Sequence, residues 1–384
     1  MKKSFFNITI LFGSVVIALI IGECGMRIVK PAQLIQTDNQ FNYYTFSSKF
    51  GWKGKPDAVG GFSRYGEYHV RVKNNSDGIR DREYPVEKKC FRMAVMGDSY
   101  TWGFGVEQDE IFMEILERAY FKNIEVFNLG LSGYSTVLSY LLFKELDAKY
   151  NYDFALFFYN TGDFKRNVEA DNNGYARPYA ATEKGALVFK GLPVREAKPV
   201  YHGLKSKLYI RKLVSLVKAK LTGKIISLKS ASRNEPNYGY KTGDIPVPTL
   251  NDGRHDYAYG ITKEIFREIK DYCEGEGIKL VVMLNTAAWQ FDDIYKEKAT
   301  AAFKGDRWRV DWELPQKKME TIISGLKIPC LNLLPVLQKE YSATKRHPHF
   351  KIDGHYNPDG HMIIAKVFQE FLKEENLLDG RYWQ

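Results

Sequence analysis

Three residues of this sequence could together activate an alcohol for attack on an ester. Ser99 follows a short apolar run, and Asp353 and His355 lie on one turn-rich loop near the carboxyl end. A serine hydroxyl is a weak nucleophile until a base takes its proton, and a neutral imidazole can do so near neutral pH. Asp353 could hold the other imidazole nitrogen and stabilise the imidazolium. Taken singly, each has a structural explanation: a helix cap for Ser99, a turn for Asp353 and an exposed histidine for His355.

The segment around Ser99 has the pattern of a strand, a tight turn and a helix. Met93 to Met96 is apolar and predicts a buried strand, Gly97 to Ser99 interrupts it, and a helical pattern begins at about Asp109. Such a turn places the hydroxyl at the carboxyl end of a strand, where open α/β sheets bind their ligands. Backbone N–H groups at the turn could stabilise a developing negative charge.

The rest of the chain alternates predicted strands and helices, which indicates an α/β fold with a central parallel sheet. Further strands are expected at Ile124–Asn128, Asp153–Tyr159, Lys279–Leu284 and Pro329–Leu333, and helices at Val137–Leu146, Tyr259–Tyr272, Leu314–Leu326 and His361–Glu374. Residues 165–255 interrupt this alternation and are predicted to be an insertion. Within it, a basic segment, Lys205–Lys229, could form a helix that packs on the domain or lies on an anionic surface. The polar segment Ser230–Asp252 predicts a loop.

The amino-terminal 30 residues predict a signal anchor. Lys2 and Lys3 precede an apolar run, Phe5 to Ile21, which approaches the about 20 residues that span a bilayer. A cleaved signal peptide and a buried core helix are the alternatives. The anchor would leave the larger domain, residues 91–384, outside the cytoplasm, in the periplasm or at the cell surface. Residues 31–90 form an amino-terminal extension in which short strands such as Glu67–Val72 are expected.

The amino-acid composition argues against several classes of function. The 384 residues are 44% hydrophobic and 27% charged, as in a folded globular protein, and the net charge of +10 comes with no nucleic-acid-binding signature. Four cysteines without a C-x-x-C pair argue against a zinc site or a redox motif. His347 and His349 could bind a metal, but no carboxylate accompanies them at a suitable spacing, so an exposed loop and no metal are expected. The sequence does not predict the oligomeric state.

Four blocks of the sequence occur in the order typical of one hydrolase superfamily. These are GDSYTWGFGV from Gly97, NLGLSGYST from Asn128, Thr161-Gly162-Asp163 after an apolar strand, and DGHYNPDGH from Asp353. The combination resembles the SGNH (GDSL-type) hydrolase superfamily over about residues 75–164 and 259–372. The apolar amino terminus and NSDGIRD, which begins at Asn75, resemble a membrane-anchored bacterial subgroup.

The resemblance implies a three-layer α/β/α, flavodoxin-like fold and a set of site residues. Ser99 would be the nucleophile, His355 the base and Asp353 its partner, and the N–H groups of Ser99 and Gly133 would form the oxyanion hole. The third block departs from the family, because Gly162 stands where the family has asparagine. Three explanations stay open: a weaker hole, replacement of the donor by Asn160, or loss of hydrolysis. His361 is expected on the helix surface or near the site.

The resemblance also implies a substrate class. Membrane-anchored relatives act on O-acetyl groups of cell-envelope or exported polysaccharides, so a glycan O-acyl esterase or O-acetyltransferase that needs no cofactor is expected. A non-catalytic glycan-binding or assembly protein and a lipid esterase are the alternatives. The substrate would be an acylated small molecule or glycan, and nucleic acid is not expected as a partner.

Overall fold

The protein is built around a five-stranded parallel sheet. The computed structural model describes residues 2–29, 43–64, 67–172, 175–196, 253, 255–291, 311–351 and 353–384. The strands lie in the order β13-β12-β7-β5-β6, and all four neighbouring pairs are parallel. Numbered along the chain this is 2-1-3-4-5, the flavodoxin-like order. The strands are β5 (Phe91–Gly97), β6 (Ile124–Gly130), β7 (Phe154–Tyr159), β12 (Lys279–Leu284) and β13 (Cys330–Asn332).

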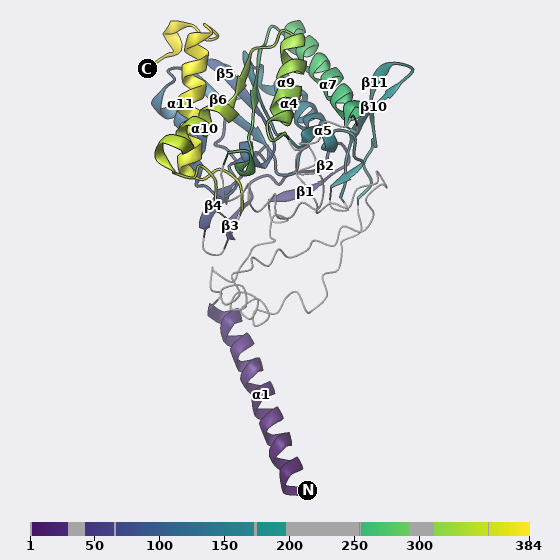
Figure 1. The fold of residues 1–384 in the computed structure, drawn as a ribbon, viewed down its shortest axis with the longest axis vertical. Coiled ribbons are helices and arrows are strands. Elements are labelled where there is room, and N and C mark those ends of the chain that lie inside the picture. The colour runs from purple at the N-terminus through teal and green to yellow at the C-terminus, as the bar shows by residue number, and fades with distance from the viewer. Residues whose placement is uncertain are drawn as a thin grey trace.

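Helices cover both faces of the sheet, so the domain has three layers (Figure 1). Alternate residues of each strand enter two separate cores: along β5, Ala94 and Met96 join one core, and Met93 and Val95 join the other. The first core is completed by α4 (Thr136–Tyr150), α7 (Asp256–Gly275) and α9 (Leu314–Gly325), and the second by α3 (Phe112–Ala119), α10 (Leu333–Thr344) and α11 (Pro358–Glu374). The predicted α/β fold with a central parallel sheet is therefore confirmed.

Strand β7 shows why these segments form the centre of the sheet. All six of its residues are buried and apolar, as expected of a parallel strand covered on both faces. One helix, α10, was not expected, because the predicted strand ran on to Leu333. Instead β13 ends at Asn332, whose side chain accepts a hydrogen bond from the Leu334 N–H and caps α10.

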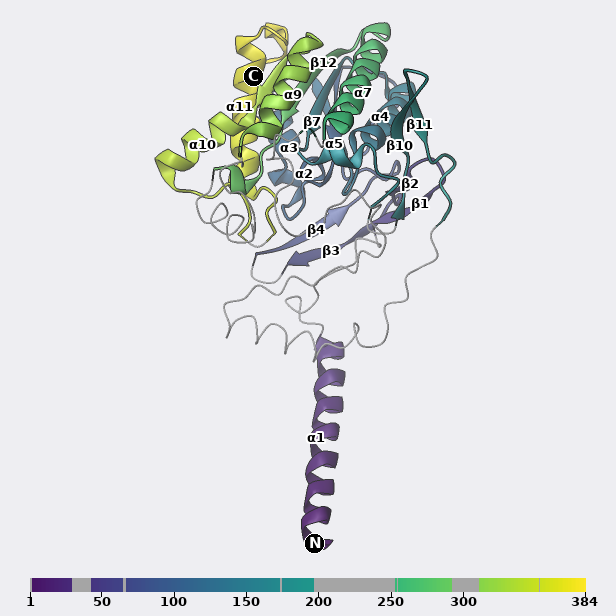
Figure 2. The same ribbon diagram turned by 45° about the vertical axis from the view of Figure 1, so that its right-hand side comes forward.

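The amino-terminal extension forms two antiparallel hairpins, in agreement with the short strands expected there. They are β1 (Tyr44–Ser47) with β2 (Gly51–Gly54), and β3 (Val59–Arg64) with β4 (Tyr68–Lys73). Figure 2 shows the β3–β4 hairpin beneath α2 (Ser99–Trp102), on the side of the domain that faces α1. The hairpin packs against the chain that follows the serine turn, because Phe62, Val70 and Val72 share a cluster with Trp102 and Phe104.

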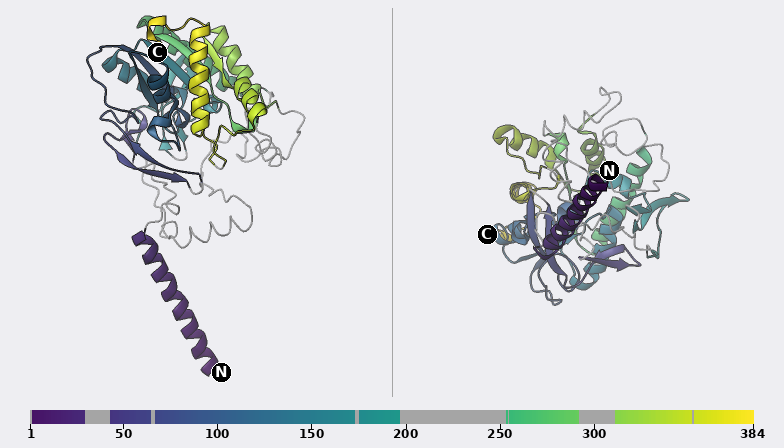
Figure 3. Two further views of the ribbon diagram at one scale, coloured as in Figure 1. Left: turned by 90° about the vertical axis from the view of Figure 1, so that its left-hand side faces the viewer. Right: turned by 90° about the horizontal axis from the view of Figure 1, so that it is seen from below.

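Helix α1 (Lys2–Val29) extends away from the domain in the side views (Figure 1; Figure 3, left). The sequence predicted a membrane anchor in this segment. Within the described ranges, no helix combines the length and the apolar character that a bilayer crossing requires. The structure therefore does not support the predicted transmembrane helix.

The described part of the insertion consists of short elements, of which the β10–β11 hairpin packs beside α7. Helix α5 (Asp163–Arg166) is followed by two hairpins, β8 (Asp171–Asn172) with β9 (Tyr175–Ala176) and β10 (Tyr179–Glu183) with β11 (Ala186–Lys190). The segments Lys205–Lys229 and Ser230–Asp252, for which a helix and a loop were predicted, lie outside the described residues. Short 3₁₀ turns occur at Gln108–Glu110, Ala288–Gln290 and Gly380–Tyr382.

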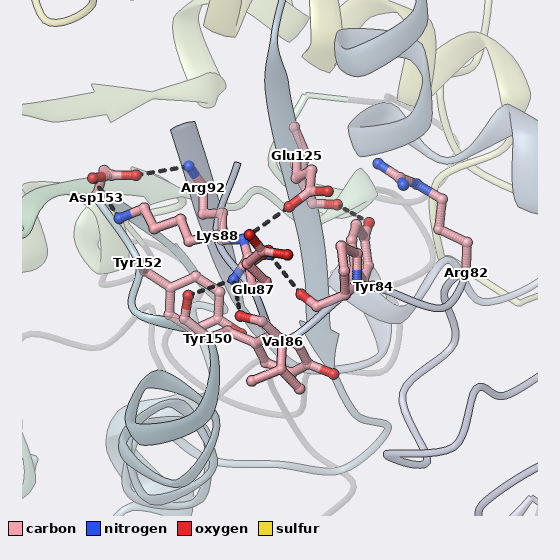
Figure 4. Close-up of polar contacts among 12 residues, drawn as sticks. Arg82, Tyr84, Val86, Glu87, Lys88, Arg92, Glu125, Tyr150, Tyr152 and Asp153 are labelled. Carbon is pink, nitrogen blue, oxygen red and sulfur yellow. Dashed lines mark hydrogen bonds and ion pairs between the residues drawn. The ribbon is translucent and has the colours of Figure 1, made fainter. Parts of the chain in front are cut away.

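The amino end of β5 is fixed by a buried arginine (Figure 4). The Arg92 side chain is 0% exposed, and its Nε donates to Glu125 at 2.8 Å. Its two terminal nitrogens donate to backbone carbonyls, including those of Pro85 at 2.6 Å and Tyr150 at 2.8 Å. The Arg92 backbone N–H donates to Asp153 at 2.8 Å, and Lys88 pairs with the same carboxylate at 2.7 Å. This end of the strand is thus held by charge-assisted hydrogen bonds.

Candidate active site

The nucleophile turn is shaped by Gly97 and Asp98. A Cβ on Gly97 would lie 2.1 Å from Thr101 Oγ1 and 2.9 Å from the Phe158 carbonyl oxygen, so no side chain fits there. Asp98 caps the short helix α2, and its carboxylate accepts from the Tyr100 N–H at 3.0 Å. Ser99 is consequently the first residue of α2, directly at the carboxyl end of β5. The predicted strand and turn are both observed.

The structure brings Ser99, His355 and Asp353 together. His355 Nε2 lies 2.8 Å from Ser99 Oγ, and His355 Nδ1 is hydrogen-bonded to Asp353 Oδ1. Asp353 and His355 come from the loop before α11, which packs against α3 in the second core. A hydroxyl, an imidazole and a carboxylate in this order are the arrangement that makes serine nucleophilic. The predicted spatial meeting of the three side chains is observed.

Two aromatic rings flank the His355 imidazole. The Phe104 ring is stacked on it with centroids 4.3 Å apart, and the Tyr100 ring lies 4.5 Å away. The Tyr100 hydroxyl also donates to the Gly354 carbonyl at 3.2 Å, which ties α2 to the histidine loop. These contacts restrict the orientation of the imidazole toward Ser99.

Asp353 lies in a buried cluster of charged and polar groups. Its side chain is 3% exposed and pairs with Arg64, while the Tyr68 hydroxyl donates to Oδ2 at 3.2 Å. Burial alone would raise the pKa of Asp353, but the hydrogen bond and the charge of His355, together with Arg64, outweigh it and hold the pKa below its ordinary 3.8. Asp353 is therefore ionised at neutral pH and can stabilise an imidazolium. Burial and the nearby carboxylate raise the pKa of Tyr68, which remains a hydroxyl donor.

Residues in and next to the third sequence block form a second polar cluster, which holds the serine turn in place. Asp98 Oδ2 accepts from Arg166 at 2.8 Å and from Asn160 Nδ2 at 2.9 Å. Arg166 also contacts Asp163 at 3.2 Å. Burial raises the pKa of Asp163, Arg166 opposes this shift, and the nearby Asp98 adds to it. The guanidinium of Arg166 thus holds the Asp98 cap in place.

The structure shows what the residues expected at the oxyanion hole bind. Asn160 Oδ1 accepts from the Gly162 N–H at 2.9 Å, while its amide nitrogen donates to Asp98, so Asn160 braces the serine turn. Replacement of the missing donor by Asn160, one of the three explanations, stays a prediction, because the amide nitrogen has a second hydrogen besides the one that Asp98 accepts. Gly133 lies in the turn between β6 and α4 with φ +79°, a conformation that favours glycine. The Ser99 and Gly133 amides remain the predicted oxyanion donors.

Two histidines of this region, His349 and His361, are buried. His361 was expected on the helix surface or near the site; the surface alternative is wrong, because the side chain is buried and its Nδ1 accepts from the Phe112 N–H at 3.3 Å. His349 was expected on an exposed loop, but it is buried against Tyr356 and Phe291. Burial lowers the pKa of each to about 3, so both are neutral. Across the described ranges, no group of three or more His, Cys, Asp or Glu residues could hold a metal.

Four residues that support the triad were not identified from the sequence: Arg64, Tyr68, Phe104 and Arg166. The alternating segment Glu67–Val72 gave one usable signal, because it predicted a strand with one buried face. No local pattern shows that this strand reaches a loop almost 290 residues later.

Several solved structures to which the chain is similar are GDSL-type hydrolases and esterases. A member of the lipolytic G-D-S-L family from Veillonella parvula is 12% identical, with coverage of 73% of this chain and 97% of that one and a TM-score of 0.37. A lipase/acylhydrolase from Enterococcus faecalis is 10% identical, with coverage of 74% and 96% and a TM-score of 0.36. For the acetyl xylan esterase AlAXEase, identity is 9%, coverage 73% and 98%, and the TM-score 0.38.

No protein-family model and no curated protein matches the chain. The structural similarities are low and carry no conclusion about function.

Proposed function

We propose that the protein is an SGNH-type serine esterase that removes a short acyl group, such as acetyl, from a hydroxyl of a glycan. The observation that carries the proposal is the contact of 2.8 Å between Ser99 Oγ and His355 Nε2, with Asp353 on the other imidazole nitrogen. A non-catalytic protein would have no need of this hydrogen-bonded order. An intact triad therefore favours an enzyme over a glycan-binding protein.

The residues perform the reaction in two steps. Ser99 Oγ attacks the ester carbonyl while its proton passes to His355 Nε2, and the negative charge develops on the carbonyl oxygen. His355 then gives the proton to the departing alcohol, which leaves an acyl-serine. Water, activated by the same imidazole, attacks the acyl-serine and releases the acid and the free hydroxyl of Ser99. Asp353 stays ionised throughout and stabilises the imidazolium.

The surroundings of Gly133 support a small acyl group. A Cβ on Gly133 would lie 2.7 Å from Asn172 Nδ2 and 3.3 Å from the Trp52 ring. The Trp52 indole is itself fixed, because its N–H donates to the Ser132 carbonyl at 3.1 Å. Side chains from the extension and from the insertion thus crowd the turn that carries the predicted oxyanion donor. This crowding favours acetyl over a long acyl chain.

The glycan portion of the proposal rests on the resemblance to membrane-anchored relatives. Transfer of the acyl group to an acceptor hydroxyl instead of water would use the same acyl-serine, and we propose hydrolysis because it needs no second substrate. A location outside the cytoplasm stays a prediction from the sequence.

Ester hydrolysis by the full-length protein tests the proposal. Acetylated xylose and a long-chain p-nitrophenyl ester should be compared, with Ser99→Ala as the inactive variant and Ser342→Ala, exposed on α10, as the matched control. We expect acetate release by the wild type and by the control variant, and little turnover of the long chain. Preference for the long chain would indicate a lipid esterase. No hydrolysis of either ester by folded protein would favour a binding protein.

A further inference from the structure

The register of the β3–β4 hairpin places two polar side chains beside each other at its tip. Arg64 pairs with Tyr68, and two residues further along each strand Phe62 pairs with Val70. Because side chains alternate along a strand, these four residues share one face of the hairpin. Phe62 and Val70 are buried on this face, whereas His69 and Arg71 on the other face are exposed.

The shared face points at the acid of the triad. Arg64 pairs with Asp353 Oδ2, and Tyr68 donates to the same oxygen at 3.2 Å. The Asp353 backbone N–H donates to Glu67 at 2.9 Å, so the hairpin holds this residue through main chain and side chain. His355 uses the other carboxylate oxygen, Oδ1. Because each of the two Asp353 carboxylate oxygens binds different partners, the plane of the carboxylate is fixed.

The hairpin is itself firmly attached to the catalytic domain. The Phe62 ring lies 4.5 Å from the Phe104 ring, which stacks on His355. The Tyr68 ring lies 4.9 Å from the Phe350 ring of the histidine loop. The Arg71 N–H also donates to Glu107, at 3.0 Å to Oε1. The tip that carries Arg64 and Tyr68 is thereby fixed relative to Ser99 and His355.

From these contacts we propose that the amino-terminal extension completes the active site, with Arg64 and Tyr68 as positioning residues that orient Asp353 toward His355. The inference rests on the proposed esterase function. Neither residue touches the reacting atoms. Arg64 acts through Asp353: it holds Oδ2, leaves Oδ1 for the imidazole, and places a positive charge near the position where the imidazolium forms.

Several charged and titratable groups face this cluster. Asp353 on the loop and Arg64 and Glu67 on the hairpin are charged. Tyr68 and Tyr100 are hydroxyls whose pKa values burial raises, and His349 and His361 are neutral because burial lowers their pKa to about 3. Among these groups, Arg64 is the cation bound directly to the acid of the triad, whereas Arg166 binds Asp98 beside Ser99. Removal of Arg64 would take this positive charge away from the triad.

Steady-state kinetics of Arg64 variants of the full-length protein test the inference. For Arg64→Gln we expect kcat on an acetyl ester to fall about 10- to 100-fold with little change in KM, as when a partner that orients a reactive group is lost. The acid limb of the kcat/KM profile should move to higher pH. Arg64→Lys should restore part of kcat and the pH profile, because it keeps the charge. Arg71→Gln, on the exposed face of the same hairpin, is the matched control.

A second variant keeps the test independent of folding defects. Tyr68→Phe removes a single hydroxyl and should lower kcat several-fold with an unchanged midpoint of thermal unfolding. The inference is overturned if Arg64→Gln and Tyr68→Phe behave like Arg71→Gln in kcat and in pH profile while the wild type is active. A folded wild type without any esterase activity would overturn the proposed function as well, so the two failures are distinguishable.

Discussion

The two ends of strand β5 use arginine in opposite ways. At the amino end, Arg92 is completely buried, and its nitrogens are bound by Glu125 and by several backbone carbonyls. At the carboxyl end, the Arg64 side chain is 31% exposed and binds Asp353, which in turn binds the histidine next to Ser99. Arg92 therefore stabilises the fold, and Arg64 supports the residues that react.

Residues that stabilise the fold and residues that support the reaction lie at opposite ends of β5. The Arg92 network joins segments that form the base of the sheet, and none of its members reaches the triad. The Asp353 cluster is assembled from a hairpin, a helix turn and a loop that lie far apart in the sequence. Changes at the amino end should lower the free energy of unfolding, and changes at the carboxyl end should lower turnover.

The largest expected effect is the loss of the base. His355→Gln should lower kcat by about 10⁵- to 10⁶-fold, as in serine hydrolases that lose their histidine, because no other group can take the Ser99 proton. The midpoint of thermal unfolding should change little. His347→Gln, in the preceding loop, is the control and should retain activity. Substantial residual turnover in His355→Gln would contradict the role of the triad.

Arg92→Met should have its effect on stability instead. It leaves Glu125 and several carbonyls without their buried donor, so we expect a loss of about 3–5 kcal/mol in the free energy of unfolding, measured by urea titration. The kcat of the folded fraction should equal that of the wild type. An Arg92→Met variant with the free energy of unfolding of the wild type but a lower kcat would contradict the structural role of Arg92.

Gly162→Asn tests whether a side-chain amide at position 162 can serve as an oxyanion donor. Gly162 has φ −92°, which any residue adopts, and the nearest atom to a Cβ there is Asn160 Oδ1 at 3.5 Å. Since one oxyanion donor is worth about 10²- to 10³-fold, even partial recovery of the family's amide should raise kcat about tenfold. Gly162→Ala should have no effect. No gain from asparagine would show that this position does not face the carbonyl oxygen.

The last prediction concerns acid stability, and it involves neither end of β5. The pKa of buried His349 is lowered from 6.5 to about 3, so the unfolded chain binds the extra proton first as the pH falls. The stabilisation is complete above pH 6.5 and decreases toward pH 3, by up to about 1.4 kcal/mol per pH unit. His349→Phe should flatten this part of the stability profile, measured by urea titration from pH 7 to pH 4. An unchanged slope would contradict the assignment.

The sequence predicted the parts of the molecule that depend on local patterns. Strand β12 spans the predicted Lys279–Leu284, and the strand before Ser99 was recognisable because a buried parallel strand is continuously apolar. Ordered motifs also indicated that Ser99 and His355 meet. Helix α10 was missed because Leu333 continues the apolar run of the strand before it.

The supporting residues could not be predicted, because they depend on long-range packing. The pairing of Arg64 with Asp353 joins residues 289 positions apart, and no local periodicity encodes it. His349 was expected on an exposed loop, and His361 on the helix surface or near the site, yet aromatic neighbours and the packing of α11 bury both rings. Their burial follows from the tertiary structure and not from the residue type.

The central claim is that Ser99 is a nucleophile activated by His355. Labelling of the full-length protein with a fluorophosphonate, followed by peptide mass spectrometry, tests it most directly. We predict a single modified peptide with the adduct on Ser99, and no labelling of folded His355→Gln. Folded wild-type protein that stays unlabelled, or that is modified at another serine, would contradict the account.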